Sequence, residues 1–398
     1  MNKEKLIKLA NRNEVSLFDR GGRKTTPPYY YVSLRHAMGF YFNTFITNNI
    51  WYDYYAFKSA PLKSQGTLSN DVDEENSVNA IIFFERFLEL FLKDVLRKVD
   101  RRFTYDIKGL DKNRNNAQQI ITKIRNKKLE AKKHNKKPLT APFRQAIRRY
   151  YELIDLLQNG NKDRVVKKFA KIHKEYSFLD SEDFKATMEL LSWYRDRLLH
   201  NGNRCPTLLL LDYIMSQRVI PLIREICKKE ESVLGESLFY LKTPSGIDIL
   251  ESICSIKFEY KDLDKRETKL NLLYLGHLKE MGRASLNMNL HVRSNVQAGY
   301  EYNYKDPKGR AKRFALAECS GSDYKHPDFP NPVECPCCGE TTLVVYRVTL
   351  EKSVLHGGKR ADIDWIKCYL CDYHLRYNAA DPIYFQLSKQ KLFISEHY

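Results

Sequence analysis

Apolar residues recur at spacings of three and four positions between residues 77 and 97, which is the pattern of an amphipathic helix. A second apolar edge, formed by Ile82, Phe83 and Leu90, widens the apolar stripe. A helix with this much apolar circumference is expected to contact neighbours on two sides. The residues of the main stripe are Ala80, Ile81, Phe84, Phe87, Leu88, Phe91, Leu92 and Val95.

The same periodicity predicts that residues 66–257 form an all-α domain. An aromatic-rich helix is expected before it, at 33–56, and its rings are assigned to a core or an interface. The other predicted helices cover 141–158, 163–175, 181–200, a stretch from Pro206 to 229, and 233–256.

Two stretches depart from this helical pattern. Residues 98–140 are rich in Lys and Arg, and we interpret them as a basic insertion, largely a solvated helix that Pro138 ends. After residue 258 the pattern changes, and a linker is expected first, followed by one more helix at 269–281. Strand-like alternation follows at 285–292 and 299–304, and a clear strand is predicted at 342–350. The predicted fold class is therefore mainly α, with a C-terminal α+β region, in four segments: 1–65, 66–257, 258–330 and 331–398.

The net charge of the chain indicates which class of binding partner to expect. The chain of 398 residues has 67 Lys and Arg against 49 Asp and Glu, a net charge of +18. An excess of this size is typical of proteins that meet a polyanion, such as RNA, DNA or an anionic membrane surface. No apolar run would span a membrane, and the charged N-terminus lacks the apolar core of a signal peptide. We therefore expect a cytoplasmic protein.

Two Cys-x-x-Cys knuckles stand near the C-terminus. They pair Cys335 with Cys338 and Cys368 with Cys371. In a chain expected in a reducing compartment, such pairs favour metal binding over disulfides. Four thiolates complete the tetrahedral shell of Zn²⁺ and leave no open position. The spacing therefore predicts a structural zinc site in a zinc ribbon at 331–398.

Two residues offer alternatives to this ligand set. Cys337 lies inside the first knuckle, and His374 lies three residues after Cys371. The alternative explanation without metal is four unpaired cysteines with accidental spacing. Zinc ribbons serve in both nucleic-acid and protein contacts, so the motif indicates a metal rather than a function. A deaminase-like site is not expected, because no His-x-Glu accompanies the cysteines.

A second group of chemistry-bearing residues ends the helix predicted at 181–200. Arg195, Asp196 and His200 lie in its last turns, and Asn201 and a glycine then stop it. The helix dipole and Asp196 both favour a protonated imidazole at His200. Arg195 offers a guanidinium for a phosphate, and His200 offers a proton near neutral pH. The group suits a phosphodiester, and a histidine that only caps the helix is the alternative.

The sequence Arg-[Asp/Asn/His]-x-x-x-His near a helix end resembles the signature of the HEPN superfamily, and Arg195, Asp196 and His200 match it. The resemblance covers about 77–230 and implies a helical bundle that acts as a metal-independent RNA endonuclease. In that reaction the 2′-hydroxyl attacks the adjacent phosphate and leaves a 2′,3′-cyclic phosphate. By this resemblance His200 is the general acid or base, Arg195 stabilises phosphate charge, Asp196 orients either of them, and Asn201 polarises the site.

The resemblance also implies partners. HEPN domains usually act as homodimers with two motifs facing each other across one cleft, and many serve in toxin–antitoxin pairs, abortive infection and antiphage defence. RNA would be the substrate, with tRNA as one candidate, and an antitoxin or a phage-derived trigger would be the regulator. The predicted RNA-binding residues lie in the basic insertion: Lys123, Arg125, Lys127, Lys128, Lys132 and Lys133.

A further basic cluster precedes the cysteines, beside alternating tyrosines that either stack on unpaired bases or pack on a strand. Its members are Arg283, Arg293, Lys308, Arg310, Lys312 and Arg313, with Tyr300, Tyr302 and Tyr304. The sequence shows no P-loop, no Gly-rich dinucleotide fingerprint, no His-Glu-x-x-His and no paired-carboxylate pattern. Two rival functions remain: a non-catalytic nucleic-acid-binding zinc-ribbon protein, and a scaffold or antitoxin-like partner of another protein.

Overall fold

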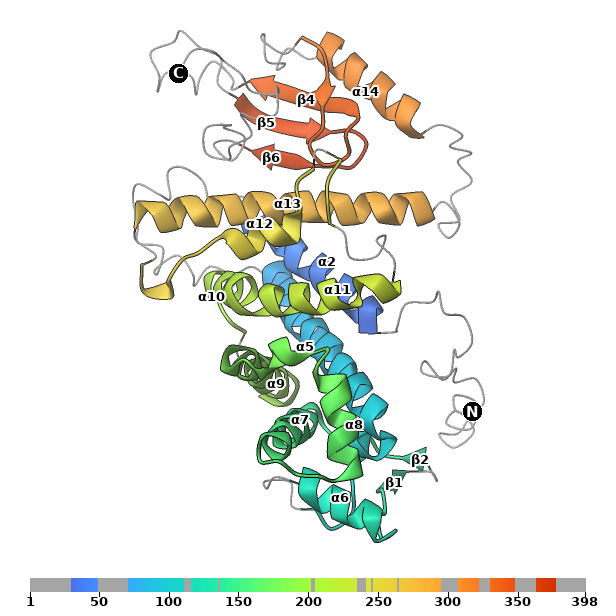
Figure 1. Cartoon of the computed structure of the whole chain (residues 1–398). Helices are drawn as coiled ribbons and strands as arrows, with labels where there is room; N and C mark the ends of the chain where they lie inside the picture. The colour runs from blue at the N-terminus through green and yellow to red at the C-terminus, as the bar shows by residue number, and fades with distance from the viewer. Residues whose placement is uncertain are drawn as a thin grey trace, which may run out of the picture.

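The structure is a computed structural model of the 398-residue chain. It describes residues 30–48, 71–110, 116–134, 137–201, 205–234, 241–244, 246–262, 265–294, 307–321, 330–347 and 363–376. In these residues the fold is mainly helical, and a small antiparallel sheet follows near the C-terminus (Figure 1). The predicted fold class is confirmed.

Helix α5 (Asp71–Val99) is the central helix of the bundle (Figure 1). It contacts α2 (Tyr30–Asn48), α7 (Phe143–Gln158), α8 (Arg164–His173) and α9 (Glu182–Asn201). Its apolar residues lie on both predicted edges, so it needs partners on more than one side. The expectation of contact on two sides is confirmed.

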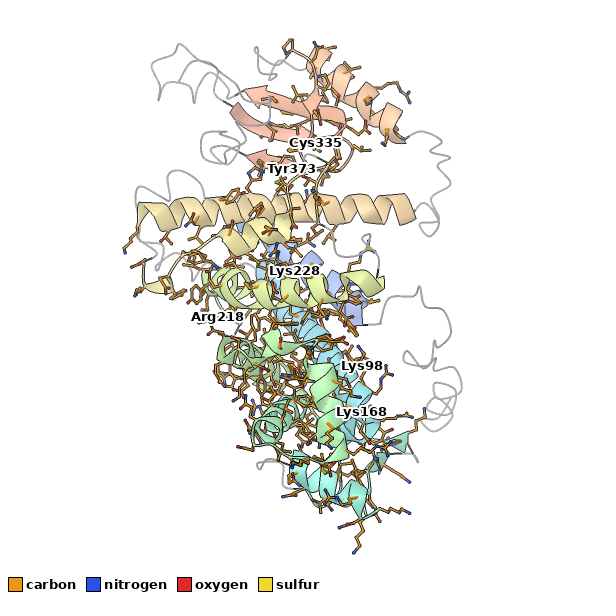
Figure 2. All side chains as sticks on the ribbon, viewed as in Figure 1. Lys98, Lys168, Arg218, Lys228, Cys335 and Tyr373 are labelled. Carbon is orange, nitrogen blue, oxygen red and sulfur yellow. The ribbon has the colours of Figure 1, made fainter. Side chains whose placement is uncertain are left out.

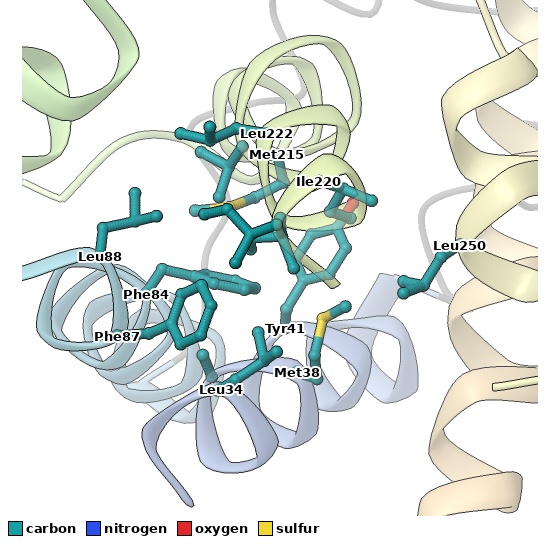
Figure 3. Packing of buried hydrophobic residues seen from close by; sticks show 14 of the residues in the cluster. Leu34, Met38, Tyr41, Phe84, Phe87, Leu88, Met215, Ile220, Leu222 and Leu250 are labelled. Atoms are coloured by element: carbon teal, nitrogen blue, oxygen red, sulfur yellow. The ribbon is translucent and has the colours of Figure 1, made fainter. Parts of the chain in front are cut away.

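The aromatic residues of α2 supply one of those contacts. Tyr41 and Phe42 are fully buried, and Tyr41 lies between α5 and the helices that follow α9 (Figure 3). Phe40 stacks on Phe83 of α5 with ring centroids 5.5 Å apart. The prediction that these rings belong to a core is confirmed for α2. Trp51, Tyr54 and Tyr55 of the predicted helix 33–56 lie outside the described residues.

The other helical elements complete the bundle and lead to the sheet. They are η1 (Arg101–Thr104), α6 (Ala117–Arg125), η2 (Ser177–Asp180), α10 (Leu208–Ile214), the π-helical turn η3 (Met215–Val219), α11 (Ile220–Leu234), α12 (Ile249–Ser255), η5 (Tyr260–Asp262), α13 (Arg266–Ser294) and α14 (Pro307–Gly321). Three of these helices begin at N-cap side chains that accept a hydrogen bond from a backbone amide of the first turn. The caps are Asp163 for α8, Thr207 for α10 and Asp248 for α12.

The strands form two sheets. β1 (Lys133–His134) and β2 (Lys137–Pro138) pair within the basic insertion. The C-terminal sheet is antiparallel in the order β3-β4-β5-β6. Its strands are β3 (Val333–Glu334), β4 (Thr341–Arg347), β5 (Ile363–Cys368) and β6 (His374–Arg376). β4 corresponds to the strand predicted at 342–350.

Three predictions of secondary structure are wrong. The strand predicted at 285–292 lies inside α13, and the described part of 258–330 is helical rather than strand-rich. The helix predicted at 233–256 is interrupted by a turn in which the Gly246 amide donates to the Thr243 carbonyl at 2.8 Å, and Gly246 has φ +91°. The basic insertion is not one solvated helix, because its backbone pairs in β1 and β2 after α6.

Helix α13 lies between the bundle and the sheet (Figure 1). Towards the bundle, Nζ of Lys279 donates to Oδ1 of Asp212 in α10 at 2.8 Å, and both side chains are almost completely buried. The same ammonium lies 4.8 Å from the centroid of the Tyr41 ring. Breaking a buried ion pair by removing one partner is costly, so this contact fixes α13 on the bundle.

One cluster of buried apolar side chains runs from Tyr30 in α2 to Leu375 in β6. It therefore crosses the predicted boundaries between the segments, and those boundaries stay a prediction. Among the described residues, no helix has both the length and the apolar character that a membrane span requires.

The contact between α2 and α13 gives a prediction for stability. A Cβ on Gly282 would lie 2.4 Å from the ring of Phe42. We expect Gly282→Ala to lower the free energy of unfolding by about 1–3 kcal/mol, because the ring must shift within a packed core. Gly39→Ala is the matched control, since a Cβ at Gly39 of α2 meets nothing within 4 Å. Chemical unfolding of both variants measures the difference, and equal stabilities would refute the tight contact.

Candidate functional site

The four cysteines of the two knuckles lie together. Their sulfur atoms all lie within 4.8 Å of one another, and all four residues are buried. The Sγ atoms of Cys335 and Cys371 are 3.6 Å apart, and those of Cys338 and Cys368 are 3.7 Å apart. Sulfurs that bind one zinc ion tetrahedrally at about 2.3 Å lie roughly 3.8 Å apart. The donor set and its spacing therefore fit a tetrahedral metal site.

The two knuckles repeat one backbone pattern. The amide of Cys335 donates to the carbonyl five residues later, and the amide of Cys368 does the same, at 3.0 and 2.8 Å. The amide four residues after each of these cysteines donates back to that cysteine's carbonyl. At that position each chain turns through a positive φ, +71° at Gly339 and +59° at Asp372. The repeat presents two sulfurs from each knuckle to the same point.

Backbone amides also point at the sulfurs. The amides of Cys337 and Leu370 donate to Sγ of Cys335 and Sγ of Cys368, each at 3.4 Å. Such hydrogen bonds favour the thiolate, which is the form that binds a metal. Cys337 itself is buried, but neither it nor His374 belongs to the four-residue group, so the described residues do not support these alternative ligands.

The second knuckle docks on α13. Arg283 donates to the carboxylate of Asp372 at 3.2 Å and to its backbone carbonyl. Glu280 binds Arg283 through both carboxylate oxygens at 2.7 Å and accepts from the His374 amide at 2.7 Å. Tyr373 lies between the sheet and α13 (Figure 2), and its hydroxyl is 2.5 Å from Nε2 of the buried His277. The cysteine site is thereby tied to the helix that carries the bundle contact.

Arg195 and Asp196 lie near the end of α9, as predicted. Nη1 of Arg195 donates to Oδ1 of Asp196 at 3.2 Å, and both side chains are partly exposed. His200 and Asn201 form the last turn of α9, and their side chains lie outside what the structure describes. The contact of His200 with the other motif residues therefore stays a prediction.

Two residues that the sequence analysis did not predict lie beside this motif. Arg144, in the first turn of α7, has Nη2 at 3.7 Å from Oδ2 of Asp196. Glu85, on α5, is buried and interacts electrostatically with Arg195 and Asp196. The sequence did contain a signal for Glu85, because this carboxylate stands among the apolar residues of the α5 stripe. No sequence signal pointed to Arg144, because its contact exists only in the tertiary structure.

Glu85 belongs to a charged row on α5. Nζ of Lys93 contacts Oε1 of Glu89 at 2.5 Å, one turn from Glu85. Burial raises the pKa of Glu85 to about 7, the Glu89 carboxylate acts in the same direction, and Arg195 opposes them. A carboxyl group that titrates near neutrality beside an arginine is a frequent feature of functional sites.

The predicted RNA-binding residues lie at the far end of the bundle from the sheet, around α6 and β1 (Figure 1). Two of them make ion pairs: Arg125 with Asp163, and Lys132 with Asp106 at 3.1 Å. Lys127, Lys128 and Lys133 are exposed. Lys123 is half-buried, and its Nζ reaches the Lys108 carbonyl at 3.4 Å.

The second basic cluster is divided by the structure. Arg283 is buried in the α13 contact and is not available to RNA. Lys308 and Lys312 of α14 pair with Glu340 at 2.6 and 3.1 Å. Arg310 lies over the ring of Phe314. Tyr300, Tyr302 and Tyr304 lie outside the described residues, as does the side chain of Arg293.

No family model matches the chain, and no curated protein or solved structure shows significant similarity to it. The functional assignment therefore rests on the two groups of residues described above.

The knuckles generate a prediction about metal content. We expect Cys335→Ser to lose most of the bound metal, because it removes one of four sulfurs that converge on one point. Cys337→Ser is the matched control, since Cys337 is buried in the same knuckle but lies outside the four-residue group. Elemental analysis of both purified variants measures metal per chain. Equal metal content in the two variants would contradict the ligand assignment.

Glu85 generates a prediction about pH. Its pKa is raised from 4.5 to about 7 in the folded protein. The folded state therefore holds this proton more tightly than the unfolded chain, and the resulting stabilisation is complete below pH 4.5 and lost as pH rises through 7. We expect Glu85→Gln to remove this loss, which is about 3 kcal/mol for a shift from 4.5 to about 7.

The measurement is chemical unfolding at pH 4.5, 6 and 8. The difference in stability between Glu85→Gln and the wild type should grow with pH. Glu130→Gln is the control, because the Glu130 side chain is 74% exposed. The assignment fails where both variants show the same pH dependence as the wild type.

Proposed function

We propose that the chain is a metal-independent endoribonuclease of the HEPN type, with a structural zinc ribbon. The observation that carries the proposal is the motif at the end of α9, where Arg195 and Asp196 are partly exposed and in contact. A second guanidinium, from Arg144, lies at the same carboxylate. Positive charge at an exposed helix end, beside a proposed general acid–base histidine, suits a phosphodiester.

The proposed reaction needs no metal. The 2′-hydroxyl oxygen forms a bond to phosphorus, and the bond from phosphorus to the 5′-oxygen breaks. One group accepts the 2′-hydroxyl proton and another delivers a proton to the leaving 5′-oxygen, so the products are a 2′,3′-cyclic phosphate and a 5′-hydroxyl. His200 is assigned to one of these transfers. Arg195 stabilises the charge on phosphate, Asp196 orients its neighbours, and Asn201 polarises the site.

The metal is proposed to be Zn²⁺, held by Cys335, Cys338, Cys368 and Cys371. When bound, it would close the ribbon without an open coordination position, so its contribution is structural. Binding of about 10–16 kcal/mol, as in zinc-finger peptides, would stabilise a small sheet with little core of its own. No step of RNA cleavage is assigned to it.

Homodimerisation is part of the proposal. Two large apolar side chains on α9 are exposed beside the motif: Trp193 at 40% and Leu199 at 53%. Apolar exposure next to a charged site is a common feature of interfaces. The proposed setting is a cytoplasmic toxin, or an effector of abortive infection or antiphage defence, controlled by an antitoxin or a phage-derived trigger.

A second candidate is a nucleic-acid-binding protein without catalysis. The exposed lysines of the basic insertion favour it, since Lys127, Lys128 and Lys133 would bind phosphates whether or not the motif cleaves. A scaffold or antitoxin-like role, holding another protein, is the third. RNA cleavage distinguishes the first candidate from the other two.

The decisive experiment is cleavage of total RNA by the purified full-length protein. We expect the wild type to cut RNA in the presence of EDTA mild enough to leave the ribbon loaded, and to leave cyclic-phosphate ends. His200→Ala and Arg195→Ala should each lower the rate by a factor of 100 or more, on the order of the loss of a general acid–base or phosphate-stabilising group. Sequencing of the ends identifies the RNA that is cut.

Arg218→Ala serves as control, because Arg218 pairs with Asp183 at the opposite end of α9 with similar exposure. All variants are first compared by thermal unfolding and by mass in solution. Identical cleavage by the wild type and both motif variants would place the activity elsewhere. Binding of RNA without any cleavage would favour the second candidate.

A further inference from the structure

Arg144 lies beside the motif although the sequence separates them. It sits in the first turn of α7, and its Nη2 lies 3.7 Å from Oδ2 of Asp196. On the other side of that carboxylate, Nη1 of Arg195 lies 3.2 Å from Oδ1. Asp196 is therefore flanked by two guanidiniums that come from two different helices, each at its own oxygen.

The positive charge of Arg144, Asp196 and Arg195 is not needed for the stability of the fold. One carboxylate neutralises only one of the two guanidiniums. The nearby carboxyl group of Glu85 is buried and its pKa is raised to about 7, so at neutral pH and below it does not fully cancel the remaining positive charge. The three side chains also remain open to solvent: Arg144 is 47%, Asp196 41% and Arg195 38% exposed. Ion pairs this exposed contribute little to folding. A cation in the first turn of a helix is moreover opposed by the helix dipole.

An anion would use the excess charge. A phosphodiester has two non-bridging oxygens, and guanidinium groups bind phosphate oxygens in a planar, directional way. The position also suits a nucleic-acid chain, because α7 contacts α6 of the basic insertion as well as α9 (Figure 1). Arg144 thus lies on the helix that connects the exposed lysines to the motif.

We infer that Arg144 is a second phosphate-binding residue, and that Arg144 and Arg195 together bind one phosphodiester of the RNA. Asp196 holds the two guanidiniums in place until the phosphate takes over their hydrogen bonds. The inference rests on the proposed function for the identity of the substrate. It adds a substrate contact from a helix that the motif does not include.

A purely structural ion pair would behave differently from a phosphate site. If Arg144 served only to hold Asp196, removing either partner would have the same effect. In a phosphate site the effects on RNA binding have opposite signs, because Arg144→Ala removes a donor whereas Asp196→Ala removes a competing acceptor. Binding, measured without cleavage, separates the two roles.

The experiment measures binding of a fluorescent single-stranded RNA, 2′-O-methylated throughout so that it cannot be cleaved, to the full-length protein over a range of salt concentrations. We expect Arg144→Ala to weaken binding about tenfold and to lower the slope of log affinity on log salt by about 0.7. Asp196→Ala should bind more tightly than the wild type, because it removes the carboxylate that competes with the phosphate for the two guanidiniums. Arg144→Gln repeats the test with the side-chain stem retained, should Arg144→Ala unfold.

Arg218→Ala is the matched control and should bind within twofold of the wild type. Binding by Arg144→Ala and Arg144→Gln within twofold of the wild type overturns the inference, and so does an equal loss in Asp196→Ala. Cleavage of unmodified RNA is measured in parallel with the binding of the methylated RNA. Weaker binding by Arg144→Ala, together with a wild type that never cuts, would retain the phosphate site and reject the ribonuclease.

Discussion

Helix α13 has charged groups buried on both sides, and the arrangement of the molecule depends on their pairing. Towards the bundle, Lys279 meets Asp212, and towards the sheet, Arg283 meets Glu280 and the second cysteine knuckle. A charge left unpaired in such surroundings would cost several kcal/mol. Lys279 pairs with a residue of α10, and Arg283 and Glu280 of α13 together contact Asp372 and the His374 amide of the second knuckle, so the bundle and the ribbon are each held against one side of the same helix.

The helices differ in how well the apolar periodicity of the sequence predicted them. Helix α5 was predicted because its main apolar stripe follows the helical period, and a second edge only widened it. In α13 apolar and polar residues alternate from Ser285 to Val292, and this imitated a strand because periodicity over so short a stretch does not separate a strand from part of a longer helix. The helix predicted at 233–256 is broken by the turn at Thr243–Gly246. The sequence contained signals for this turn, a proline and a glycine, and the glycine has a positive φ in the structure.

The candidate sites show the same division between local and distant information. The cysteines were found because each knuckle is a local turn with its own glycine or aspartate at positive φ, and one strand pair brings the two knuckles together. Arg144 was not found, since its approach to Asp196 depends on how α7 packs against α9. Glu85 could have been noticed, because a carboxylate in an apolar stripe needs a reason to be there.

The contacts of α2 impose an order on folding. Tyr30 donates to Glu230 at a sequence separation of 200 residues, and Phe42 packs on Gly282 still later in the chain. The ribosome therefore releases α2 long before the partners that cover its aromatic rings have been made. Nascent chains with exposed apolar surface are prone to aggregate. The aromatic rings of α2 are consequently covered on all sides only after Glu230 and Gly282 have been made, and α5, which follows α2 in the chain, is the described helix that can cover them earlier.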